Sequence, residues 1–307
     1  MQELDKLTNK VARIENFFVE NAHYILNTRE QKLILHLAAN LDLKKQDFYE
    51  QIIPVKNLEQ MLKKGSAKWG GIYKELNNLG DKLSLKRIVF PTEVVVDGKS
   101  LNGYIPWFST IAPCHNEKGE VCIKFKFNPE LKPFLLKLNQ YVRINLLEIA
   151  GMDSFYSLRL YQIFKANLAK QDKHLKIISK VYDLKGLREL LGTKSKYEEY
   201  KYFNRDILMK ATKEINNHTQ IFVKYESQRT NRKITHIRFT FCDKRNHREY
   251  KQLSFADYDL RPYKSIFPVP CLDQHSCFLT KILANADRYS DPPFKDIFDL
   301  LAMFDAW

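Results

Sequence analysis

This sequence of 307 residues has no uninterrupted apolar run long enough to cross a bilayer, and its N-terminus lacks the apolar core of a signal peptide. Cysteine is scarce and scattered, without a C-x-x-C pair; the five are Cys114, Cys122, Cys242, Cys271 and Cys277. These absences exclude a membrane span, a secreted disulfide scaffold and a cysteine zinc site. We therefore expect a cytoplasmic protein without membrane contact, with reduced, buried and inert cysteines.

The sequence also lacks the residue patterns of common catalytic sites. Asp97-Gly98-Lys99-Ser100 imitates the end of a phosphate-binding loop, but Glu93 stands where that pattern needs a glycine. A metal-dependent nicking initiator needs two histidines one residue apart, and none of the eight histidines has such a partner. Serine and cysteine nucleophile motifs are absent as well. We predict no catalytic residue, metal or cofactor, although a nicking enzyme with an unrecognised active site stays open as an alternative.

Acidic residues are too few to balance the basic ones, and the imbalance is uneven. The net charge is +14 over the chain and −2 over residues 246–307, so residues 1–245 carry +16. A positive charge of that size on one part of a protein indicates a polyanionic partner, and nucleic acid is favoured over a membrane. Hydrophobic residues make up 44% of the chain, enough for folded cores. The length fits two domains and a tail.

Residues 194–217 show the strongest helical pattern in the chain. Their apolar positions recur at the spacing of one helix face, namely Tyr200, Phe203, Ile207, Leu208, Ala211 and Ile215. The opposite face holds Glu198, Tyr202, Arg205, Met209 and Lys213, with Lys201 on its flank. A shorter helical pattern over 181–192 precedes it, and two alternating strands follow over 221–241. This order is typical of a helix-turn-helix with a β wing.

The same order occurs earlier in the chain. A helix over 26–42 with Thr28 as its cap, a helix over 53–64, a turn containing Gly70 and Gly71, and a helix over 71–84 precede β-rich runs over 87–96, 103–113 and 120–127. Leu58 aligns with Leu187 at an offset of 129 residues, which also relates Met61 to Leu190. We therefore predict an α+β fold with two winged-helix units in tandem.

Both units offer candidate DNA-binding residues, which are basic, amide or tyrosine side chains of the predicted helix-turn-helix segments or basic residues of the polar turn over 227–233. In the second unit they are Lys194, Lys196, Lys201, Tyr202, Asn204, Arg205, Arg229, Arg232 and Lys233. In the first unit they are Lys68, Lys74, Asn77 and Asn78. We expect the second unit to read bases and the first to contact phosphates.

Several segments resemble the initiator Rep proteins of theta-replicating bacterial plasmids with iterons. The matching segments are LNTREQKLILHLA (26–38), FNPELKPFLLKL (127–138), SFYSLRLYQIFK (154–165), Tyr200-x-x-Phe203-x-Arg205-x-Ile207-Leu208 and Lys213-Glu214-Ile215-Asn216. The resemblance covers roughly residues 20–242. It implies two winged helices that bind direct repeats at a plasmid origin, recruit the host initiator and helicase, and repress their own gene as a dimer on an inverted repeat. Family members often have a basic run where this chain reads Asn204-Arg205-Asp206, so the base preference stays open.

These observations divide the chain into three expected parts. Residues 1–130 form the first unit, which contacts the DNA backbone and dimerises through an unpaired edge of the strands EVVV (93–96) or EVCIKFKF (120–127). Residues 131–242 form the sequence-specific unit. Residues 243–307 form a tail whose last segment has an apolar stripe on Phe294, Ile297 and Leu301. The stripe either folds back on the body or docks a partner, and a pure transcription repressor remains an alternative function.

Overall fold

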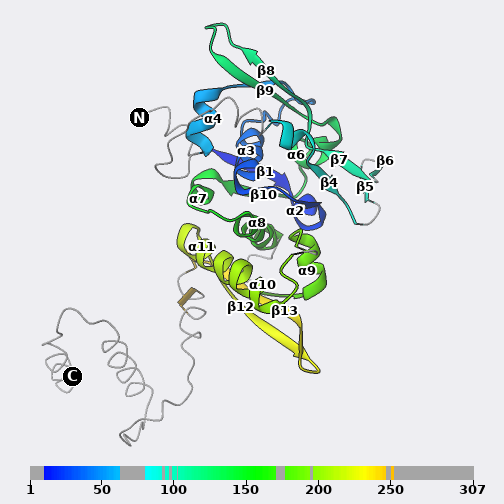
Figure 1. Ribbon diagram of the computed structural model, residues 1–307, viewed down its shortest axis with the longest axis vertical. Coiled ribbons are helices and arrows are strands. Elements are labelled where there is room, and N and C mark those ends of the chain that lie inside the picture. Colours follow the sequence, from blue (N-terminus) through cyan, green and yellow to red (C-terminus); the bar gives the residue numbers. More distant parts are fainter. Residues whose placement is uncertain are drawn as a thin grey trace, which may run out of the picture. The chain divides into compact units, whose positions relative to one another are not determined.

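The computed structural model describes residues 10–62, 80–91, 94–96, 99–101, 103–170, 177–193, 196–246 and 250–251 (Figure 1). Its helices are α2 (Asn16–Asn21), α3 (Thr28–Ala39), α4 (Val55–Leu62), α6 (Lys132–Leu135), α7 (Leu146–Ala150), α8 (Phe155–Lys170), α9 (Leu184–Leu190), α10 (Tyr200–Phe203) and α11 (Lys210–His218), with a 3-10 helix η1 (Pro129–Leu131) and a π-helix η2 (Asn204–Met209). Its strands are β1 (Val11–Glu15), β2 (His23–Tyr24), β3 (Gln51–Pro54), β4 (Arg87–Val89), β5 (Val94–Val96), β6 (Lys99–Leu101), β7 (Tyr104–Pro106), β8 (Phe108–His115), β9 (Val121–Phe127), β10 (Tyr141–Asn145), β11 (Ile177–Asp183), β12 (Ile221–Thr230) and β13 (Lys233–Asp243).

Two three-stranded sheets repeat one arrangement. In the first, β3 leads into α4, and β3 pairs with β9 of the β8–β9 hairpin. In the second, β11 leads into α9, and β11 pairs with β13 of the β12–β13 hairpin. Leu58 of α4 and Leu187 of α9 are both buried, as the repeat predicts. The expected α+β fold with two winged helices is confirmed.

The N-cap of helix α3 lies one residue earlier than the sequence suggested. The cap is Asn27, whose side chain accepts from the backbone N–H of Glu30 while the Glu30 carboxylate accepts from the backbone N–H of Asn27. This reciprocal pair is a capping box. Thr28 is instead the first helical residue, and its hydroxyl donates to the carbonyl of Asp153 at 2.9 Å. The start of α3 is therefore fastened to the segment that precedes α8.

The expectation of a free strand edge at EVCIKFKF is wrong. Strand β9 is the central strand of its sheet, with β3 on one side and β8 on the other. Within the described residues the outer edge of this sheet on the hairpin side is β8, and Pro113 in β8 lacks a backbone donor. Strand β5 of the EVVV segment pairs with β6, and Val95 is exposed.

Most residues of helix α8 are buried. Its Arg159 is fully buried and donates to the Tyr24 hydroxyl at 3.0 Å and to the Ala22 carbonyl at 2.6 Å. The guanidinium also lies 4.5 Å from the centroid of the Tyr24 ring. Burial lowers the pKa of Arg159 because no water solvates its charge. Arg159 therefore connects α8 to β2 through directional contacts in the core.

A long-range strand pairing crosses the predicted domain boundary between residues 130 and 131. Strand β10 lies beyond that boundary, yet it pairs antiparallel with β1, with Val11 opposite Asn145 and Glu15 opposite Tyr141. The Glu15 carboxylate also accepts from the backbone N–H groups of Asn139 and Gln140. Residues 139–145 are thus attached to the N-terminal segment.

Candidate DNA-binding surface

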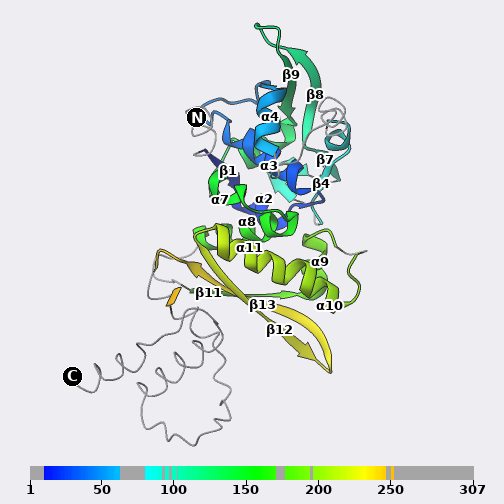
Figure 2. The same cartoon turned by 60° about the vertical axis from the view of Figure 1, so that its left-hand side comes forward.

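The segment over 200–218 is one continuous helical run made of α10, η2 and α11 (Figure 2). Five of the six residues predicted for the inward face, namely Phe203, Ile207, Leu208, Ala211 and Ile215, are fully buried. The sixth, Tyr200, is half-buried and packs against the core. These side chains belong to one hydrophobic core with the sheet β11–β13–β12 and with α8. The middle of the run is π-helical, a geometry that frequently marks functional sites.

The Lys-Glu-Ile-Asn end of this helix fixes its position. The Glu214 carboxylate accepts from the backbone N–H groups of Asp153 and Ser154, both at 3.1 Å, just before α8. The Asn216 amide donates to the Val223 carbonyl at 2.9 Å and accepts from the Val223 N–H at 2.8 Å on β12. Two polar side chains thus join the helix to α8 and to the wing, which sets where its outward face points.

The outward face is exposed as predicted. Glu198, Lys201, Tyr202, Met209 and Lys213 are exposed, and the side chain of Arg205 retains 61% of its accessible surface. Asn204 lies differently from its neighbours, because its side-chain oxygen accepts from the hydroxyl of Tyr225 at 2.7 Å and lies 3.4 Å from that of Tyr200. Asn204 therefore contacts two tyrosines of the unit, Tyr200 and Tyr225. Further along the same helical run, Lys210 is exposed, although the sequence selection omitted it.

Arg205 is paired with its sequence neighbour Asp206. Arg205 Nε lies 2.6 Å from one carboxylate oxygen of Asp206, and Nη2 lies 2.9 Å from the other. The Arg205 guanidinium holds the pKa of Asp206 below its ordinary value, and the Asp206 carboxylate raises the pKa of Arg205. The guanidinium also lies 5.3 Å from the centroid of the Tyr202 ring, a cation–π distance. The candidate base-reading arginine is therefore oriented before any partner binds.

The wing tip carries the predicted basic residues, but its turn is shorter than the predicted 227–233, because β12 extends to Thr230 and β13 begins at Lys233. Arg229, Arg232 and Lys233 are all exposed, and the two-residue turn places Asn231 and Arg232 at positive φ, 48° and 71°. Two positive φ values in a two-residue hairpin loop indicate a type I′ turn. Arginine is an unfavourable residue for this conformation, so its presence at the tip points to a role of its charge.

Arg232→Gly is expected to relax the turn and to remove one phosphate contact. The slope of log affinity against log salt should fall by about 0.9, the value for one phosphate on duplex DNA, while stability stays equal or rises by up to about 1 kcal/mol. Salt titration of binding to duplex DNA measures the slope.

Asn231→Gly is the matched control for that change, because it relaxes the same turn and removes no charge. Its salt slope should equal that of the unmodified protein. Equal slopes for all three proteins would show that Arg232 does not contact phosphate.

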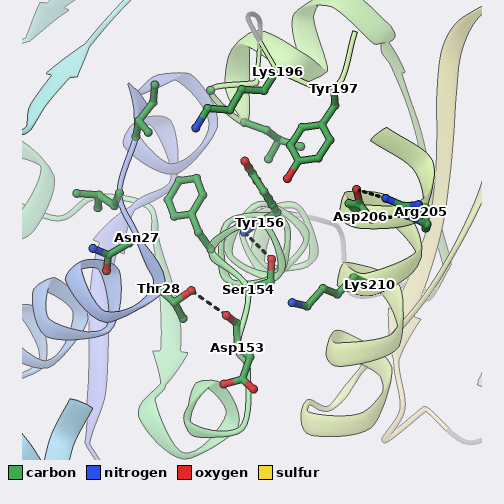
Figure 3. Close-up of a pocket in the computed structure, with 15 residues that line it drawn as sticks. Asn27, Thr28, Asp153, Ser154, Tyr156, Lys196, Tyr197, Arg205, Asp206 and Lys210 are labelled. Carbon is green, nitrogen blue, oxygen red and sulfur yellow. Dashed lines mark hydrogen bonds and ion pairs between the residues drawn. The ribbon is translucent and has the colours of Figure 1, made fainter. Parts of the chain in front are cut away.

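A cavity of about 530 Å³ lies beside the helical run over 200–218 (Figure 3). Lys196 and Lys210 line it together with Tyr156 and Tyr197, whose rings meet edge to face with centroids 6.3 Å apart. Tyr197 has a φ of 56°, an uncommon value for a residue with a side chain. Asp153 and Asp206 also line the cavity, so its charge is mixed. We assign no ligand to it.

Five of the candidate residues fall outside the described residues, namely Lys68, Lys74, Asn77, Asn78 and Lys194. The same holds for Gly70, Gly71, Cys271, Cys277 and the apolar stripe of the tail. Exposed basic residues that the sequence selection omitted include Lys210, Lys213 and Arg238 in the second unit and Lys118 in the first hairpin turn. Applying the rule of basic turns to both hairpins would have identified Lys118.

Among the described residues, no group of three or more histidine, cysteine, aspartate or glutamate side chains is arranged to hold a metal ion. In the same part of the chain, no helix combines the length and apolar character needed to span a membrane. Cys122 and Cys242 are buried and Cys114 is half-buried, and all three are free thiols.

Comparison with known proteins agrees with the architecture. Residues 12–165 match the family model described as "Initiator Replication protein, WH1", and residues 183–241 match "Initiator Rep protein, WH2". An Escherichia coli protein named "Replication initiation protein" is 23% identical over 99 residues, which cover 32% of this chain and 31% of that protein. This match spans about a third of that relative.

One solved structure supports the fold. "Crystal structure of Pi initiator protein in complex with iteron DNA" aligns with a TM-score of 0.56 and 20% identity, over 77% of this chain and 98% of that chain. At this level of identity the likeness concerns the fold.

Proposed function

This chain belongs to the family of initiator replication proteins, and on that premise we propose that it initiates replication of a plasmid by binding repeated origin DNA. The observation that carries this proposal is the exposed polar face of the helix over 200–218 beside the basic wing. The helix and the wing share one hydrophobic core, and Asn216 joins them by hydrogen bonds. The solved relative was crystallised with iteron DNA, which makes iterons, the direct repeats of such origins, the partner to test.

We assign base reading to residues 131–242 and backbone contact to residues 1–130. In a winged helix the recognition helix enters the major groove and the wing lies against the backbone. Lys196, Lys201, Tyr202 and Arg205 suit the first role, and the wing residues suit the second. The pairing of β1 with β10 ties the two parts together near their boundary, so they should bind DNA as linked modules.

Arg205→Ala should weaken binding to the cognate repeat by about 1–3 kcal/mol and change binding to mixed-sequence DNA little. Arginine contributes to specificity through paired hydrogen bonds to a base, which only the cognate sequence offers. Fluorescence anisotropy with both duplexes measures the two affinities. Equal losses on both duplexes would assign Arg205 to phosphate contact instead.

The proposal extends to self-association and to partners in the cytoplasm. A dimer formed through the first unit, where β8 is an outer strand, would present two second units related by a two-fold axis, which suits an inverted repeat in the protein's own promoter. A monomer suits direct repeats, where it would recruit the host initiator and helicase. Light scattering over a concentration series, with each DNA, tests this part. A dimer that stays intact on a single direct repeat would contradict it.

The test against an enzymatic function is a nicking assay. Pure protein, supercoiled DNA that contains the repeats, and magnesium or manganese are incubated together. We expect the DNA to remain supercoiled, and accumulation of nicked circles would overturn the proposal of a non-catalytic initiator.

A further inference from the structure

Asp206 holds Arg205 by one particular edge of the guanidinium. The contacts use Nε at 2.6 Å and Nη2 at 2.9 Å, which together form the side edge of the group. The Tyr202 ring lies near the guanidinium as well, with 5.3 Å between its centroid and the Arg205 Cζ atom. A long arginine side chain loses entropy when a partner orders it, and this pairing limits its motion in advance.

The remaining edge of the guanidinium is open for recognition. An arginine has about five N–H donors, so two contacts with Asp206 leave three, including one on each of Nη1 and Nη2 at the end of the side chain. Two parallel donors of this kind match O6 and N7 of guanine in the major groove. Both carboxylate oxygens of Asp206 are engaged by Arg205, so they are less suited to accept from a cytosine amino group.

The pair does little for folding. The side chain of Arg205 keeps 61% of its accessible surface and that of Asp206 keeps 33%, and exposed ion pairs contribute little to stability. The carboxylate also repels phosphate, which penalises docking of this helix on DNA that lacks the matching base. The arrangement therefore favours discrimination over overall affinity.

We propose that Asp206 is a specificity-determining residue, which presents the end of Arg205 to a guanine and lowers affinity for non-cognate DNA. This inference rests on the proposed function, in which the helix over 200–218 reads bases. It explains why an acid stands on a face that otherwise attracts a polyanion.

The first test compares the two kinds of DNA. A consensus duplex is selected from a random library with the unmodified protein, and affinities for it and for a mixed-sequence duplex are measured at one salt concentration. Asp206→Asn should weaken consensus binding and strengthen mixed-sequence binding, so that their ratio falls by at least about 5-fold, the lower end of what one base contact provides. Glu199→Gln is the matched control, because Glu199 is exposed at the start of the helix and its side chain does not cap it.

In the Glu199→Gln control, the ratio of consensus to mixed-sequence affinity should stay within about 2-fold of that of the unmodified protein. Removing a negative charge by itself strengthens binding to both duplexes alike. An Asp206→Asn variant that behaves like Glu199→Gln would overturn the inference, since Asp206 would then be only a charge. If the unmodified protein selects no consensus, base reading by the proposed function fails. The two failures are therefore distinguishable.

The second test identifies the base. Each guanine of the consensus is replaced by 7-deazaguanine, which lacks the N7 acceptor. At one position the unmodified protein should lose at least about 5-fold in affinity, while Arg205→Ala and Asp206→Asn lose less than about 2-fold there. An equal loss in Asp206→Asn and in the unmodified protein would overturn the positioning role. The positioning role would also be overturned if Asp206→Asn lost its preference for cytosine at one consensus position and kept its preference for guanine elsewhere. That result would indicate direct contact between Asp206 and the cytosine.

Discussion

Arg159→Ala is expected to lower the free energy of unfolding by about 3–5 kcal/mol, because it removes a large buried side chain and leaves its partners without donors. Arg159 is fully buried in α8, and the Ala22 carbonyl receives its Nη2 group at 2.6 Å. Chemical denaturation followed by circular dichroism measures the loss.

Two further substitutions separate volume from charge at this position. Arg159→Met fills most of the space and removes a buried charge, so its cost should be the smallest of the three variants. Arg159→Lys keeps the charge, but its compact ammonium is more strongly hydrated and cannot reproduce the planar fork. Lysine should therefore cost at least as much as alanine. A lysine variant as stable as the unmodified protein would contradict the role assigned to the guanidinium.

The buried side of the recognition helix was predictable because helical spacing determines it directly. Apolar residues at intervals of three and four lie on one face; the five from Phe203 to Ile215 are fully buried, and Tyr200 at the start of the helix is half-buried. The position of the wing turn was predictable from its polar composition between alternating strands. Its length was not, because β12 extends to Thr230 and β13 begins at Lys233, which leaves two residues of the predicted turn over 227–233. The tandem repeat followed from the regular offset between Leu58 and Leu187, which occupy matching helices.

Long-range pairing limited the remaining predictions. The central position of β9 depends on β3, a distant segment of the chain whose pairing leaves no local pattern. Asn204 was chosen as an amide side chain of the helix over 200–218, yet its oxygen accepts a hydrogen bond from the hydroxyl of Tyr225 on β12. The pairing of Arg205 with Asp206 depends on side-chain torsions, which residue spacing does not specify. Helical spacing determines which side chains face out, and the three-dimensional contacts determine which of those are already hydrogen-bonded to other residues of the protein.

The histidine within α3 makes stability depend on pH. Burial, together with the positive charges of Lys10 and Lys32, lowers the pKa of His36 to about 4 from the value of 6.5 for a free histidine. Between these two values the unfolded chain binds a proton that the folded protein excludes. The contribution of His36 to the free energy of unfolding is therefore fully present above pH 6.5 and is lost as the pH drops through this window. The loss is about 3 kcal/mol in total and about 2 kcal/mol between pH 7 and pH 5.

His36→Gln should remove most of this dependence, because glutamine does not titrate. Burial also lowers the pKa of His23, which acts in the same direction and should leave a smaller residual slope in the variant. His115→Gln serves as the control, since it removes a histidine that is exposed at the end of β8. Urea unfolding at a series of pH values from 5 to 7 measures the slopes. If His36→Gln kept the slope of the unmodified protein, the titrating group would lie elsewhere and α3 would not confer the acid sensitivity.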